Sequence, residues 1–80
     1  MQSQEISAEQ RQELTLLLLH LSSWEDEFGN RMAWKGHDFG LLDALVEQEL
    51  ISSNRRSKSV CLTKEGEQKA IELAKKYVTR

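Results

Sequence analysis

Three basic side chains, Arg55, Arg56 and Lys58, lie close together in the second half of the chain. Residues 51–60, which contain them, include no Asp or Glu, so this segment has a net charge of +3. Arg and Lys side chains on an exposed turn can neutralise the phosphates of nucleic acid. Together with Lys35, they are the candidate DNA-binding residues of this sequence. The alternative is that the turn is only solvated or contacts another protein.

Negative charge dominates the segment that precedes this basic cluster. Residues 38–50 contain four acidic side chains and no Lys or Arg, which gives a net charge of −4. A carboxylate can accept a hydrogen bond from cytosine, but the commonest specific base contact is made by Arg or Lys to guanine. A helix formed by this segment is therefore poorly suited to reading bases in the major groove.

Signatures of catalysis and metal binding are missing from the sequence. It contains no Gly-rich phosphate loop, no Cys-x-x-Cys and no His-Glu-x-x-His. His20 is expected near the C-terminal end of a helix and His37 in a turn, and Cys61 is expected to be a small strand residue. We therefore expect a protein that is not an enzyme, with no cofactor, no bound metal and no identifiable small-molecule substrate.

Length and composition limit the architecture that can carry these residues. Eighty residues correspond to one small domain, and a net charge of −2 excludes a protein that coats nucleic acid. The single cysteine excludes an internal disulfide and fits the reducing cytoplasm. The apolar cluster at residues 14–21 is too short to span a membrane. We expect a cytoplasmic protein with no membrane partner, in which residues 1–6 are disordered.

Helix-capping residues mark the helices of this domain. Ser7 with Gln10 has the form of a capping box, and Asp38 and Thr63 can also cap helix starts. These signals predict helices over residues 8–21, 39–49 and 64–78. A second capping-box pattern at residues 22–25, with Gly29 further on, predicts a very short helix over residues 24–28.

The apolar residues of the helices indicate how the helices pack. The second half of helix 8–21 is apolar on nearly all sides, so this helix is expected at the centre of the domain. In helix 39–49, the predicted inward stripe includes Phe39, Leu42 and Val46. Helix 64–78 has a stripe about 160° wide, counted at 100° per residue. We expect a homodimer that uses this stripe, through Ile71, Leu73, Ala74, Tyr77 and Val78.

Two further segments are predicted to form strands. Residues 31–35 alternate so that Met32 and Trp34 share one side, and residues 51 and 58–63 flank a polar turn in a β-hairpin. Trp24 and Trp34 are expected to anchor the core, because a small domain needs large apolar side chains. The alternative is that Trp34, next to Lys35, is exposed for a partner or a base.

Two sequence motifs lie on either side of the basic turn: LDALVEQELI at residues 42–51 and VCLTKEG at residues 60–66. This pattern resembles the winged-helix domains of MarR-like and PadR-like bacterial regulators over residues 39–67. The resemblance implies one α+β winged-helix domain over residues 1–80, mostly helical with a small antiparallel β-hairpin as its wing. It also implies a transcription-regulator-like protein that contacts double-stranded DNA. Residues 34–39 are similar to a family of small uncharacterised bacterial proteins, which implies no function.

This chain departs from the winged-helix pattern in two places. The short helix 24–28 is separated from Asp38 by a strand, so a helix-turn-helix would be distorted or incomplete. Glu49 stands where the pattern has glycine, and a left-handed backbone there would cost about 1–2 kcal/mol. The acidic helix 39–49 and the wide apolar stripe of helix 64–78 support a second hypothesis, namely a protein-interaction or dimerisation module that has lost DNA reading.

Overall fold

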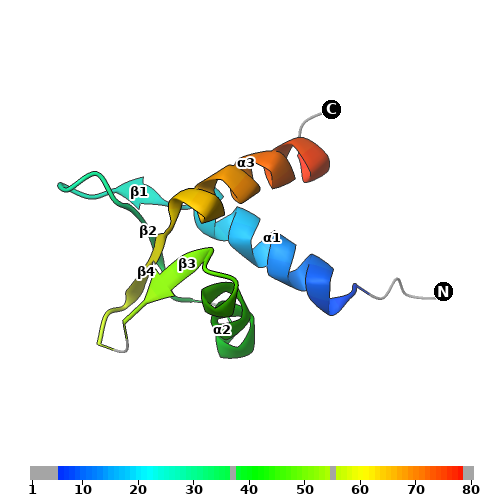
Figure 1. Ribbon diagram of the computed structural model, residues 1–80, viewed down its shortest axis with the longest axis horizontal. Coiled ribbons are helices and arrows are strands. Elements are labelled where there is room, and N and C mark those ends of the chain that lie inside the picture. Colours follow the sequence, from blue (N-terminus) through cyan, green and yellow to red (C-terminus); the bar gives the residue numbers. More distant parts are fainter. Residues whose placement is uncertain (1–5, 37, 55, 79–80) are drawn as a thin grey trace.

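The computed structural model describes residues 6–36, 38–54 and 56–78. This part of the chain forms three helices and four strands, so the predicted α+β class is confirmed (Figure 1). In chain order these are α1 (Ala8–Leu21), β1 (Trp24–Glu25), β2 (Arg31–Trp34), α2 (Phe39–Glu47), β3 (Ile51–Ser53), β4 (Ser59–Leu62) and α3 (Lys64–Tyr77). None of the described helices has the length and apolar character needed to cross a bilayer. The predicted disordered segment 1–6, apart from Ile6, lies outside the described residues.

The four strands form one antiparallel sheet in the order β1-β2-β4-β3. The β2–β4 pairing places Ala33 opposite Val60, and the β3–β4 pairing places Ile51 opposite Leu62. These four side chains are buried on one face of the sheet. The helices pack on the side of the sheet that carries them (Figure 1).

Helix α1 lies between α2 and α3 and contacts both of them, as well as β2 (Figure 1). Its Leu16 and Leu19 are almost completely buried and join Leu45 of α2 in the core. The prediction that this helix is the centre of the domain is therefore confirmed. One side of α1 nevertheless stays exposed.

The three predicted helix caps are confirmed. At the start of α1, the Ser7 hydroxyl accepts from the Gln10 amide at 3.0 Å, and the Gln10 side chain accepts from the Ser7 amide. The Asp38 carboxylate accepts from two amides of the first turn of α2. The Thr63 hydroxyl accepts from the Gly66 amide at the start of α3. Each helix therefore begins where the local sequence specifies it.

The predicted short helix over residues 24–28 is wrong, because this segment forms β1 and a turn. The serine hydroxyls that would cap a new helix instead end α1. Ser22 donates to the Leu18 carbonyl at 2.8 Å and Ser23 donates to the His20 carbonyl at 2.6 Å. The Asp26 carboxylate then accepts from two turn amides, which lowers its pKa. As a result the chain reverses at Gly29, whose φ is +84°, and returns as β2.

The end of α2 and the start of α3 meet at Leu50. The Leu50 amide donates to the Leu45 carbonyl and the Glu49 amide to the Val46 carbonyl, which is a Schellman motif with Glu49 at its left-handed position. The φ of Glu49 is +62°, so this chain tolerates the strain where the winged-helix pattern has glycine. A Cβ on residue 66 would overlap the Leu50 carbonyl, which explains why glycine stands three residues after the Thr63 cap.

Helices α1 and α3 are also joined by a polar contact. The Glu13 carboxylate accepts from the Tyr77 hydroxyl at 2.7 Å and from the Lys76 amine at 3.2 Å. The hydrogen bond from Tyr77 is the main reason that the pKa of Glu13 lies below its ordinary value. Tyr77 is thus engaged within its own chain.

Candidate functional site

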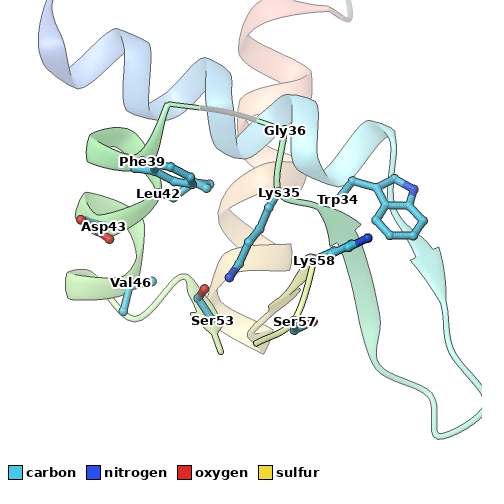
Figure 2. Close-up of a pocket in the computed structure, with 10 residues that line it drawn as sticks. All are labelled: Trp34, Lys35, Gly36, Phe39, Leu42, Asp43, Val46, Ser53, Ser57 and Lys58. Atoms are coloured by element: carbon cyan, nitrogen blue, oxygen red, sulfur yellow. The ribbon is translucent and has the colours of Figure 1, made fainter. Parts of the chain in front are cut away.

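An open apolar pocket lies between α2 and the hairpin formed by β3 and β4; we call it the α2–hairpin groove (Figure 2). Its α2 wall is formed by Phe39, Leu42, Asp43 and Val46. Its other wall is formed by Ser53, Ser57 and Lys58 of the hairpin, with Trp34, Lys35 and Gly36 at the end of β2. The groove therefore separates the acidic segment from the basic one.

The α2 wall exposes apolar side chains that the sequence pattern places in the core. Phe39 is 73% exposed and Val46 is 37% exposed, whereas Leu42 and Leu45 are buried. Phe39 and Val46 are seven residues apart, so they lie on the same face of α2, and this face borders the groove. The prediction of an inward stripe is wrong for these two residues.

Lys35 joins β2 to the hairpin. Its amide donates to the Lys58 carbonyl at 2.9 Å, and its amine donates to the Asn54 carbonyl at 2.6 Å. The side chain is half-buried and extends toward the hairpin, as Figure 2 shows. Lys35 therefore holds the hairpin turn in place, and part of its hydrogen-bonding capacity is used inside the protein.

Two basic side chains of the hairpin segment are described by the structure. Arg56 and Lys58 are exposed, while Arg55 lies outside the described residues. The Asn54 side chain accepts from the Arg56 amide at 2.9 Å, which gives the turn a defined shape. Within the described ranges, the one ion pair joins Lys76 to Glu13, so neither Arg56 nor Lys58 is neutralised by a carboxylate there.

The acidic side chains of α2 and of the residues that flank it are also exposed. Asp38, Asp43, Glu47 and Glu49 all lie on or beside α2, and all are exposed to solvent. A phosphate that entered the groove would approach Asp43, which lines it. The geometry therefore favours anion contacts at the outer side of the hairpin turn rather than between the two walls.

Trp34 is 62% exposed, so the prediction that it anchors the core is wrong. Strand β2 turns the small side chain of Ala33 inward, and the alternation of side chains then turns Trp34 outward. Trp24 of β1 is half-buried, and its ring centroid lies 4.8 Å from that of Trp34 with an angle of 41° between the planes. Alternation in residues 32–34 shows which residues share a face, but it does not show which face is buried.

The predicted dimer stripe of α3 is largely used inside the monomer. Leu73 is buried in the core, and Ala74 and Tyr77 pack against it. Ile71 and Val78 are the two members of the stripe that remain exposed. The stripe is wide because α3 packs against both α1 and β4, which was not visible from its periodicity alone.

Cys61, His20 and His37 carry the one thiol and the two imidazoles of the sequence. Burial raises the pKa of the Cys61 thiol, which disfavours the reactive thiolate. No group of three or more His, Cys, Asp or Glu residues within the described ranges is placed to hold a metal ion. His20 has a buried Nδ1 at the end of α1, and His37 lies outside the described residues.

Comparison with known proteins gives one match. Residues 7–80 match the profile of a family that is described as a domain of unknown function, DUF6429. The predicted likeness to a family without an assigned function is therefore confirmed, and the match itself carries no winged-helix relationship. No curated protein and no solved structure matches the chain significantly.

Proposed function

We propose that this chain, which belongs to the DUF6429 family, binds duplex DNA through the basic turn of its β3–β4 hairpin. The observation that carries the proposal is the charge of this hairpin. Residues 51–60 hold Arg55, Arg56 and Lys58 with no acidic residue, and the two cations that lie in the described ranges are exposed. Such a turn can bind phosphates without burying any charge.

The order of elements supports a winged-helix-like arrangement. Helix α2 connects β2 to β3, the β3–β4 hairpin follows, and β4 pairs with both β2 and β3. Only residues 35–38 separate β2 from α2, so no scaffold helix directly precedes α2. We therefore propose a winged-helix-like domain with an incomplete helix-turn-helix, in which the hairpin serves as the wing.

The acidic surface of α2 determines how DNA is contacted. Four carboxylates and no basic residue lie on or beside α2, so α2 is not expected to enter the major groove. Binding then depends on phosphates and is largely independent of sequence. Three phosphate contacts per chain correspond to a slope of about −2.7 in a plot of log K against log salt concentration.

This proposal is tested by fluorescence anisotropy with a labelled DNA duplex at low and high salt. The wild-type chain is expected to bind at low salt, and the triple variant Arg55→Ala, Arg56→Ala, Lys58→Ala is expected to lose at least tenfold in affinity. The matched control removes three exposed lysines from α3, through Lys64→Ala, Lys69→Ala and Lys75→Ala. The control has the same net charge as the hairpin variant, so equal losses in both would contradict a site at the hairpin. Absence of wild-type binding at low salt would contradict the proposal as a whole.

A second candidate function is a protein-interaction module, which is favoured by the apolar α2–hairpin groove. Phe39 and Trp34 border this groove and are largely exposed. Under this alternative, the wild-type chain does not bind duplex DNA, and Phe39→Ser abolishes binding of a protein partner. Neither candidate assigns a catalytic role to the chain, and both are compatible with the predicted cytoplasmic location.

A further inference from the structure

Helix α1 is apolar on more sides than a single chain covers. Its Leu16, Leu17 and Leu19 are buried against the rest of the domain. Leu14, Leu18 and Leu21 are 37%, 51% and 60% exposed. A surface helix of a monomer normally presents polar residues on its outer side. Three exposed leucines on one helix therefore indicate a surface that a binding partner covers.

The three exposed leucines form a continuous stripe. Their spacing of four and three residues places them on one face of α1, and Arg11 lies on the same face three residues before Leu14. Arg11 is also exposed. A helix of 14 residues is about 21 Å long, so the leucines cover roughly its second half and Arg11 marks its first half.

We propose that two copies of this chain associate through this face of α1, with the two helices antiparallel. A twofold axis close to Leu18 places Leu14 of one copy against Leu21 of the other, so the same stripe is complementary to itself. It also places Arg11 beside the C-terminal end of the second α1. That end carries the negative pole of the helix dipole, and Glu25 follows it in the sequence.

The charge of Arg11 favours an antiparallel over a parallel arrangement of the two α1 helices. Parallel helices would bring the two Arg11 side chains to the same end of the pair, where they repel each other. In the antiparallel pair each Arg11 lies near the partial negative charge at the C-terminal end of the other α1, and no other charged residue lies on the stripe between Arg11 and Leu21. A second copy of the chain therefore offers leucines to the leucine stripe and a partial negative charge to Arg11.

This interface differs from the one predicted for α3. In α3 the packing of Leu73 and Tyr77 against the core leaves Ile71 and Val78 exposed, and these residues are seven positions apart. Ile71 and Val78 are separated by two helical turns, so they form a smaller apolar surface than Leu14, Leu18 and Leu21, which are one turn apart from each other along α1. Ile71 is 48% exposed, which makes it a close match to Leu18 in accessibility.

Sedimentation equilibrium of the full chain over about 1–200 µM tests the proposal. The wild-type chain is expected to form a dimer, and Leu18→Glu is expected to raise the dissociation constant at least tenfold, since each dimer loses two leucine contacts and gains two opposed carboxylates. Arg11→Glu is expected to weaken the dimer as well, although it removes no apolar contact. Far-UV circular dichroism establishes that the variants remain folded.

Ile71→Glu on α3 is the matched control, and its dimer is expected to be as stable as that of the wild type. A wild-type chain that stays monomeric up to 200 µM would overturn the proposal. A dimer that is dissociated by Ile71→Glu and unaffected by Leu18→Glu would also overturn it, and would assign the interface to α3. None of these measurements contains DNA, so they are independent of the proposed function.

Discussion

Helix α2 and the β3–β4 hairpin face each other across the groove, and they differ in both charge and exposed surface. The α2 wall combines exposed Phe39 and Val46 with the carboxylate of Asp43, whereas the hairpin wall is polar and adjoins a basic turn. In a winged-helix-like arrangement these are the two elements that would approach DNA. Of the two, only the hairpin segment has a net positive charge, whereas α2 presents an acidic and partly apolar surface.

The two walls nevertheless depend on the same junction. Helix α2 ends at Glu47, and Glu49 and Leu50 form the turn that leads into β3 at Ile51. The Thr63 hydroxyl donates to the Glu49 carbonyl at 2.8 Å, and the backbone of α3 approaches Leu50 closely at Gly66. Substitutions at this junction are therefore expected to change stability, while substitutions at the hairpin turn are expected to change binding.

The largest expected effect is that of Gly66→Ala, which would disturb the support of both walls. The new Cβ would overlap the Leu50 carbonyl, and a backbone atom cannot move aside as a flexible side chain can. We expect a loss of about 3 kcal/mol or more in the free energy of unfolding, measured by urea denaturation. Gly36→Ala is the control, because its Cβ would meet no atom within 4 Å. If both variants were as stable as the wild type, the close approach at Leu50 would be refuted.

A smaller and opposite effect is expected for Glu49→Gly at the same junction. Glycine relieves the left-handed strain at φ +62°, so the free energy of unfolding should rise by up to about 1 kcal/mol. Glu49→Ala removes the same charge but keeps a side chain at this position, so it should give no comparable gain. Equal stability of the Gly and Ala variants would assign the effect to charge and not to the backbone.

The smallest expected effect is a change in DNA affinity when two carboxylates of α2 are neutralised. Asp43→Asn with Glu47→Gln should tighten binding by about two- to fourfold at low salt, since each unit charge about 10 Å from a phosphate is worth about 0.4 kcal/mol in water. Glu65→Gln with Glu72→Gln on α3 is the control. Weaker binding by the α2 variant would mean that its carboxylates contact bases, and would contradict the role assigned to α2.

Local signals in the sequence were sufficient for most of this fold. Ser7, Asp38 and Thr63 each cap a helix through hydrogen bonds to residues two or three positions away, so their roles could be predicted without tertiary information. The serines at residues 22 and 23 have the same local pattern. They end α1 instead, because β1 pairs with β2, and this pairing depends on residues further along the chain.

The charges of the candidate site could be predicted from the sequence, but the exposure of its apolar side chains could not. Net charges of segments follow from composition, so the acidic α2 and the basic hairpin were visible at once. The exposure of Trp34 and Phe39 was not, because large apolar residues are normally buried and periodicity does not identify the buried face. The bond from Lys35 to the Asn54 carbonyl joins residues 19 positions apart and has no local signature.

The salt dependence of DNA binding tests the central claim most directly. We expect log K to fall linearly with log salt concentration, with a slope of about −2.7 for one hairpin and about −5.4 when two hairpins bind as a dimer. In the Arg55→Ala, Arg56→Ala, Lys58→Ala variant the slope should approach zero, because the cations that release the counterions are gone. A wild-type slope that this variant leaves unchanged would show that the hairpin is not where the protein meets DNA.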